Sequence, residues 1–124
     1  MKRILGTSFG LLLLISALPA AAAPTNACYD WSCDPFTRTC TFDASCSFGD
    51  PIIWFYLWQF GDGSNHFTGS PATSHTYGGE SCAFDVTLTV TPFSSEPADT
   101  VSCAAVLSVC PFGPQLEFSG HCDR

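Results

Sequence analysis

Trp54-Phe55-Tyr56-Leu57-Trp58-Gln59-Phe60-Gly61-Asp62-Gly63 is the most informative stretch of this chain. Its dense aromatic run is typical of a β-strand in a packed sheet, and the two glycines around an aspartate supply the positive φ angles of a tight turn. The residues that share the parity expected to face the core are Ile52, Trp54, Tyr56, Trp58 and Phe60. The opposite parity is also apolar, so the outer face of this strand is predicted to be covered or to bind something.

Alternating patterns on both sides of this stretch predict an all-β fold. Apolar residues alternate with threonine or other polar residues, which is typical of half-buried antiparallel strands. The expected strands cover residues 27–35, 36–44, 52–60, 74–77, 82–91 and 101–109. The first of these is expected to be an edge strand. The tail, 110–124, is broken by proline, glycine and serine and is expected to form no regular strand. About seven short strands without helical periodicity predict an antiparallel β-sandwich of immunoglobulin-like type.

The N-terminus has the pattern of a cleaved signal peptide. Basic Lys2 and Arg3 precede an apolar run from 4 to 18, and small residues from 20 to 23 suit signal peptidase. The sequence thus divides into a signal peptide (1–23), a β-sandwich domain (24–109) and a cysteine-bounded tail (110–124). After cleavage, Arg38 and Arg124 stand against eleven Asp and Glu residues. Such an acidic chain predicts neither nucleic acid nor an anionic membrane as its partner.

Eight cysteines follow the predicted cleavage site. An even number in a short exported chain predicts up to four disulfides. There is no Cys-x-x-Cys pair, and His66, His75 and His121 have no metal-site spacing, so no metal and no cofactor are expected. The cysteines are Cys28, Cys33, Cys40, Cys46, Cys82, Cys103, Cys110 and Cys122.

Four ordered motifs resemble those of a PKD domain, the family named for polycystic kidney disease proteins. They are Phe42-Asp43-Ala44-Ser45, Trp58-x-Phe60-Gly61-Asp62-Gly63, His75-Thr76-Tyr77 and Val86-Thr87-Leu88-Thr89-Val90. The likeness covers roughly residues 28 to 109. It implies a seven-stranded β-sandwich that serves as a non-catalytic extracellular module for binding or spacing.

The resemblance and the strand parity together assign structural roles to the conspicuous side chains. Phe42, Tyr56, Trp58 and Phe60 are expected in the core, and Asp43, Ser45, Gly61, Asp62, Gly63, His75 and Tyr77 in structural turns and strands. No Gly-x-Ser-x-Gly motif accompanies His75, so no catalytic residue is predicted. The oxygens of Asp43 and Asp50 fall short of the six to eight ligands that calcium takes.

Immunoglobulin-like topology suggests how the cysteines pair. The second and sixth strands would run the same way in facing sheets, so the first expected pair is Cys40–Cys82. Cys46–Cys103 would follow at the opposite end of the sandwich. Cys28–Cys33 and Cys110–Cys122 are then left as local loops, with crossed pairs among these four cysteines remaining open.

The outer parity of the aromatic strand is the best candidate for binding. Phe55 and Leu57 are expected beside Thr87 and Thr89, with Ala104 and Val106 beyond them. If exposed, this stripe would bind a glycan or a protein; the alternative, which we favour, is that the tail covers it with Phe112, Leu116 and Phe118.

The predicted function is therefore a secreted, non-catalytic module that binds an extracellular protein or polysaccharide, with its oligomeric state open. A structural or adhesive surface protein, or a small effector or inhibitor, remains an alternative.

Overall fold

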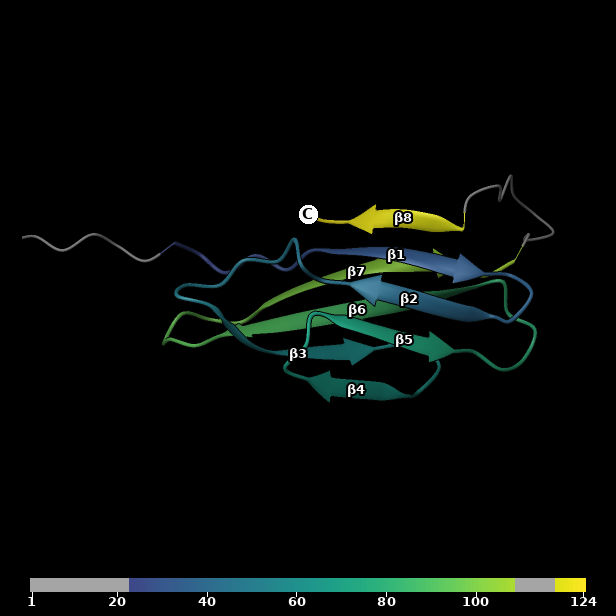
Figure 1. Ribbon diagram of the computed structural model, residues 1–124, viewed down its shortest axis with the longest axis horizontal. Helices are drawn as coiled ribbons and strands as arrows, with labels where there is room; N and C mark the ends of the chain where they lie inside the picture. The colour runs from purple at the N-terminus through teal and green to yellow at the C-terminus, as the bar shows by residue number, and fades with distance from the viewer. Residues whose placement is uncertain (1–22, 109–117) are drawn as a thin grey trace, which may run out of the picture.

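A computed structural model describes residues 23–108 and 118–124, so the predicted signal peptide lies almost wholly outside the described residues. The strands are β1 (Tyr29–Asp34), β2 (Thr39–Asp43), β3 (Ile53–Gln59), β4 (Asn65–Thr68), β5 (Ala72–Thr76), β6 (Ala83–Pro92), β7 (Asp99–Val106) and β8 (Ser119–Cys122). They form two antiparallel sheets packed face to face, in the orders β5-β2-β1-β8 and β4-β3-β6-β7 (Figure 1). The described residues contain no helix. The prediction of an immunoglobulin-like sandwich is confirmed, with eight strands in place of seven.

Aromatic side chains from both sheets meet in the centre of the core. The Trp58 ring of β3 lies edge-to-face against Tyr29 of β1 at 5.3 Å and also contacts Phe42 of β2 at 5.4 Å. The Tyr29 hydroxyl donates a hydrogen bond of 2.6 Å to the carbonyl of Val86 in the facing sheet. Burial raises the pKa of Tyr29 to about 12, so the hydroxyl stays a donor. These contacts join the two sheets.

The turn after β3 requires glycine because it packs against β6. Gly61 has a φ of 88°, and a Cβ atom there would lie 2.4 Å from the carbonyl oxygen of Asp85. The buried Tyr77 hydroxyl donates a 2.8 Å hydrogen bond to the carbonyl of Phe60, the residue just before this turn. The motif from Phe60 to Gly63 is thus held from two sides, which explains its pattern of residues.

The register between β3 and β6 shifts between Ile53 and Phe55. Such a bulge adds one residue to one strand and reverses the parity of the residues before it. Tyr56, Trp58 and Phe60 are buried, in line with their alternation, but Ile52 and Trp54 are 62% and 58% exposed. The prediction that these two residues face the core is therefore wrong.

The β1–β2 hairpin and the neighbours of β1 also differ from the sequence prediction. Cys40 and Phe42 of β2 are buried, whereas Phe36, expected on the same face, lies in the turn and is 95% exposed. Arg38 adopts a positive φ of 59° in that turn, so the alternation starts only after it. β1 is not an edge strand because β8 pairs with its free side.

The C-terminal residues belong to the sandwich. β8 lies beside β1 (Figure 1), and their register places Gly120 opposite Trp31. A Cβ atom on Gly120 would lie 2.8 Å from Nε1 of Trp31, so glycine lets the strand approach the indole ring. The prediction that residues 110–124 form no regular strand is wrong for 119–122. The strand was missed because it is stabilised by pairing with β1 and not by its own propensity.

Three disulfides have both cysteines among the described residues: Cys28–Cys46, Cys33–Cys40 and Cys103–Cys122. We call these the mapped disulfides. Cys82 is also disulfide-bonded, and Cys110 lies outside the described residues. All the predicted pairs are therefore wrong: Cys40–Cys82, Cys46–Cys103, Cys28–Cys33, Cys110–Cys122 and every crossed pair among the last four.

The physical reason is that hairpin pairing and the sheet edges decide which cysteines become neighbours, and a general immunoglobulin-like topology specifies neither. Cys33 and Cys40 are direct partners in the β1–β2 hairpin, with Cα atoms 4.0 Å apart. Cys103–Cys122 does join the two sheets, but at the edge where β7 meets β8.

Candidate functional site

Four aromatic rings form a continuous row on the outer face of the sheet β4-β3-β6-β7. We call Phe67, Phe55, Trp54 and Phe93 the aromatic row. Successive ring centroids are 4.5, 5.1 and 5.2 Å apart. Three of the four side chains are more than half exposed: Phe67 (61%), Trp54 (58%) and Phe93 (55%). The row is the largest connected set of exposed aromatic contacts among the described residues.

The bulge in β3 and the end of β6 create this row. The extra residue in β3 turns Trp54 outward beside Phe55. Phe93 follows Pro92 at the end of β6, and its N–H donates a 2.9 Å hydrogen bond to the carbonyl of Ile52. Phe67 reaches the same face from β4, where it lies opposite Leu57. Residues from three strands therefore converge on one surface.

The residues that pair with the aromatic row on β6 and line its hollow are rich in hydroxyl groups. Leu57 and Phe55 pair with Thr89 and Thr91 of β6, and the Thr89 hydroxyl bonds that of Thr100 on β7 at 2.9 Å. Trp54 and Phe93 line a shallow hollow with Thr91, Pro92 and Ser94. The surface thus offers apolar ring area flanked by neutral hydrogen-bonding groups.

Two of the three predicted binding residues belong to this face. Phe55 is part of the aromatic row and Leu57 lies beside it; both are partly buried. Val106 does not join them, because it pairs with Ala83 at the far end of β6 from Thr91. It packs against the core instead.

The tail residues predicted to cover this face are not found on it in the described part of the chain. Phe118 packs on the core, and its carbonyl accepts a 2.6 Å hydrogen bond from Cys33 in the opposite sheet. The prediction that Phe118 covers Phe55 and Leu57 is wrong. Phe112 and Leu116 lie outside the described residues. The ring that does cover part of Phe55 is Phe67 of β4.

Sequence reasoning missed Trp54, Phe67 and Phe93. Alternation predicts Trp54 in the core, because a bulge leaves no mark in the sequence pattern. Phe67 lies in a polar segment without strand alternation, and Phe93 follows a proline that ends a strand. The one available signal was the apolar character of both parities between 52 and 57, next to the loop signal at 49–51.

A second polar cluster joins the turn after β3 to β5. Nε2 of His75 lies 2.7 Å from Oδ2 of Asp62 and 3.2 Å from the Ser64 hydroxyl. The same ring nitrogen meets both groups, so His75 cannot relay a proton from a serine to an aspartate through its two nitrogens. The imidazole also stacks on Phe60, with centroids 4.2 Å apart and an interplanar angle of 1°. These contacts make the cluster a structural clasp.

The electrostatics of this clasp favour an ionised Asp62. Partial desolvation opposes ionisation, but hydrogen bonds from Ser64 and His75 outweigh it and lower the pKa of Asp62 to about 2. The carboxylate is therefore charged at neutral pH and accepts both bonds. The role expected for Asp62, a turn-forming residue, agrees with these contacts.

A family model of the PKD domain matches residues 21–105, which contain the bulged strand, the glycine turn, the clasp and Tyr77. The chain belongs to the PKD domain family. PKD domains are in general non-catalytic, immunoglobulin-like modules for extracellular binding or adhesion. No curated protein matches the chain in sequence. In residues 23–108 and 118–124, no helix is long and apolar enough to cross a membrane.

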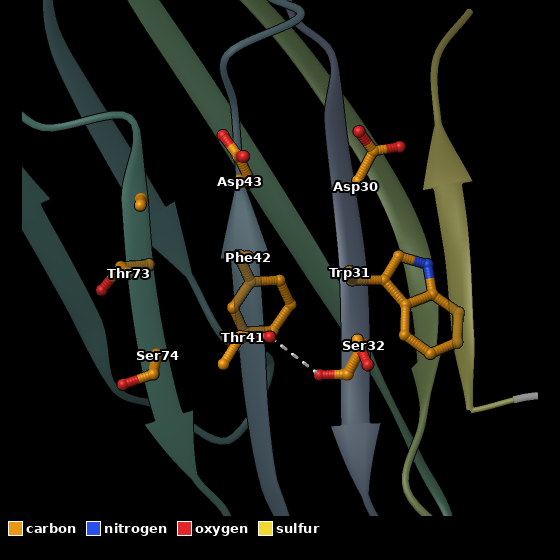
Figure 2. Close-up of a pocket in the computed structure, with 9 residues that line it drawn as sticks. Asp30, Trp31, Ser32, Thr41, Phe42, Asp43, Thr73 and Ser74 are labelled. Atoms are coloured by element: carbon orange, nitrogen blue, oxygen red, sulfur yellow. Dashed lines mark hydrogen bonds between the residues drawn. The ribbon is translucent and has the colours of Figure 1, made fainter.

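This PKD domain also has a shallow groove on the other sheet, lined by residues of β1, β2 and β5. Figure 2 shows Asp30 and Asp43 side by side on β1 and β2, where they are direct partners in the register. Asp43 accepts bonds from the Ser45 N–H (2.9 Å) and hydroxyl (2.5 Å), which lower its pKa. Asp30 lies 2.6 Å from Nδ1 of His121. Each carboxylate therefore has a local partner, and Asp43 and Ser45 cap a turn.

Cys28, Cys46 and His121 bring two sulfur atoms and an imidazole nitrogen within 4.8 Å of one another. The two sulfurs are joined in a disulfide, so they offer no thiolate to a metal ion. In this oxidised state, Cys28 and Cys46 form a cross-link, and His121 lies beside it.

Proposed function

We propose that this chain is a secreted, non-catalytic PKD module that binds an extracellular protein or carbohydrate through the aromatic row. One observation carries the proposal: Phe67, Phe55, Trp54 and Phe93 form a connected aromatic surface on the outer face of the sheet, and three of the four rings are more than half exposed. Exposed apolar patches of this kind mark interaction sites, and aromatic side chains are enriched in them.

The energetics favour binding through the most exposed rings. Burial of apolar area contributes roughly 25 cal/mol per Å², so covering a large ring yields about 1.5–3 kcal/mol. Phe93 and Trp54 line the shallow hollow at the end of the row, where a ligand would cover both rings together. These two residues are therefore the expected anchors, with Phe67 extending the contact.

Secretion is part of the same proposal. The N-terminal pattern of residues 1–23 is that of a cleaved leader, and the disulfides suit an oxidising compartment. Within the clasp, His75 contacts Asp62 and Ser64 through a single nitrogen, which argues against a catalytic triad at this position.

The test is retention of the purified protein on insoluble chitin, cellulose and collagen, with the Trp54→Ala and Phe93→Ala variants. Phe36→Ala is the matched control, because Phe36 is a more exposed aromatic that makes no ring contact among those found in the described residues. We expect retention on one polymer, loss of at least tenfold affinity in the row variants, and no loss in the control.

Retention on a polysaccharide assigns a carbohydrate ligand, and retention on collagen assigns a protein. Equal retention of the row variants and the parent protein would contradict the assignment of the aromatic row. Self-association that depends on Trp54 would instead support the structural or adhesive alternative.

A further inference from the structure

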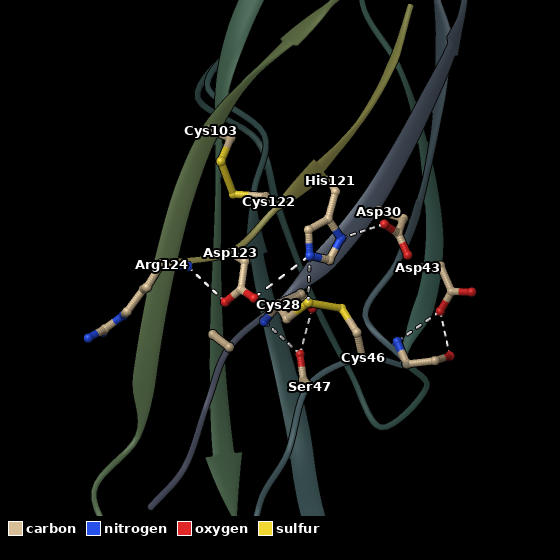
Figure 3. The surroundings of a disulfide bond; sticks show 12 residues. Cys28, Asp30, Asp43, Cys46, Ser47, Cys103, His121, Cys122, Asp123 and Arg124 are labelled. Atoms are coloured by element: carbon tan, nitrogen blue, oxygen red, sulfur yellow. Dashed lines mark hydrogen bonds and ion pairs between the residues drawn. A yellow bond between two sulfur atoms is a disulfide. The ribbon is translucent and has the colours of Figure 1, made fainter.

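The Cys28–Cys46 disulfide lies beside His121 of β8 (Figure 3), and its two cysteines differ in exposure. Cys28 is only 3% exposed, whereas Cys46 is solvent-exposed. The buried half is held by Ser47, whose hydroxyl donates to the Cys28 carbonyl (2.6 Å) and accepts from the Cys28 N–H (2.9 Å). Cys46 is thus the residue of the pair that is open to a dissolved thiol, while Cys28 is held in place.

A histidine faces the buried sulfur. Nε2 of His121 lies 3.6 Å from Sγ of Cys28, and Nδ1 lies 2.6 Å from Oδ1 of Asp30. His121 and Asp30 are direct partners in the β1–β8 register, so sheet pairing places the ring. The order carboxylate, imidazole, sulfur is the one by which an aspartate orients a histidine toward a reacting atom.

We propose that Cys28–Cys46 is a redox-active disulfide that exchanges with thiols, in which His121 supplies a proton to the departing Cys28 sulfur. No other disulfide mapped in the described residues has this arrangement. Cys33, Cys40 and Cys122 are buried. Among the mapped disulfides, the sulfur that contacts a histidine is Sγ of Cys28.

The reaction balances in two steps. A thiolate attacks Sγ of the exposed Cys46, the S–S bond breaks, and its electron pair leaves on Sγ of Cys28, which takes the proton from Nε2 of His121. The products are a mixed disulfide at Cys46, a thiol at Cys28 and a neutral imidazole that regains its proton from water. A second thiol then attacks the mixed disulfide and releases Cys46 as a thiol. The protein gains two electrons, and two thiols are oxidised to a disulfide.

The charges around His121 favour the protonated ring. The hydrogen bond to Asp30 on β1 raises the pKa of His121 despite some desolvation, and Asp123, whose Oδ2 lies 3.8 Å from Nε2, acts in the same direction. Arg124, the nearest cation in sequence, is bonded to Asp99. A leaving thiol departs faster when its thiolate is stabilised, and a neighbouring imidazolium does this.

The experiment treats the purified protein with reduced glutathione and follows each cysteine by differential alkylation and mass spectrometry. We expect Cys28–Cys46 to be reduced before the other mapped disulfides, with the glutathione adduct on Cys46. His121→Gln should slow this reduction about tenfold, a modest value for general acid catalysis because the ring is exposed. His66→Gln, at an exposed histidine of β4, is the matched control and should leave the rate unchanged.

The pH dependence separates a proton donor from a mere spacer. The rate per glutathione thiolate should fall in the parent protein as pH rises through the pKa of His121, and stay flat in His121→Gln. Asp30→Asn should move that fall to lower pH. An adduct on Cys28, an equal rate in His121→Gln and the control, or a pH profile that is unchanged in both variants would overturn the proposal.

Discussion

Gly61 and Gly63 provide a matched pair for testing why the turn after β3 has its sequence. Both have positive φ angles, 88° and 92°, so alanine is strained at either position. They differ in their surroundings. A Cβ atom at Gly61 would lie 2.4 Å from the Asp85 carbonyl oxygen, whereas one at Gly63 would meet no atom within 4 Å. The pair therefore separates backbone strain from packing against β6.

The expected cost follows from these two terms. Placing an alanine in the left-handed region costs about 1–2 kcal/mol, and this is the whole expected effect of Gly63→Ala. Gly61→Ala also forces the turn away from β6, and overpacking of this kind costs about 1–3 kcal/mol. We therefore expect Gly61→Ala to lower the free energy of unfolding by about 2 kcal/mol more than Gly63→Ala does.

Urea denaturation with the disulfides intact measures this difference. The fluorescence of Trp58, buried between the sheets, reports the loss of the core. For a domain of about 100 residues, a further 2 kcal/mol lowers Tm by roughly 8–16 °C. Equal midpoints for the two variants would show that the close approach of Gly61 to Asp85 does not constrain the fold, and would refute the reasoning.

Three further outcomes are expected. Tyr77→Phe removes the buried hydrogen bond to the Phe60 carbonyl and should cost about 1–2 kcal/mol in urea denaturation. The pKa of Asp62 is lowered from 3.8 to about 2 in the folded protein. The clasp therefore stabilises the fold fully above pH 3.8, and this contribution is lost as the pH falls through about 2. Asp62→Asn should flatten the dependence of the free energy of unfolding on pH between these two values. Replacing both Cys103 and Cys122 by alanine opens a cross-link with a sequence separation of 19 residues and should cost about 3 kcal/mol, with faster hydrogen exchange in β8.

The sequence predicts the centre of the sandwich well because burial there obeys simple alternation. Val86, Leu88 and Val90 of β6 are fully buried, as their parity predicts, and the threonines between them face outward. The glycine turn was also readable, since positive φ angles have a local chemical signature. Local patterns thus identified the fold before any long-range contact was known.

The candidate site was less predictable because it depends on departures from alternation. One extra residue in β3 turns Trp54 from the core to the surface, and no residue type announces that insertion. β8 and the cysteine pairs depend on which strands become neighbours, a property of the whole fold. Cys33 and Cys40 pair because the hairpin places them opposite each other, which a general immunoglobulin-like topology does not reveal.

The two proposed activities use different residues, although both lie at the end of the sandwich where β3 begins and β6 ends (Figure 1). The mapped disulfides close the β1–β2 hairpin, tie Cys28 to the segment after β2, and join β8 to β7. The aromatic row lies on β3, β4 and the end of β6, where no mapped cystine contributes a residue. Reduction of Cys28–Cys46 should therefore leave binding through Trp54 and Phe93 intact. If binding were lost together with that disulfide, the segment from Cys46 to Ile53 would couple the two, because Gly49 in this segment packs closely on Ile53 and Pro92.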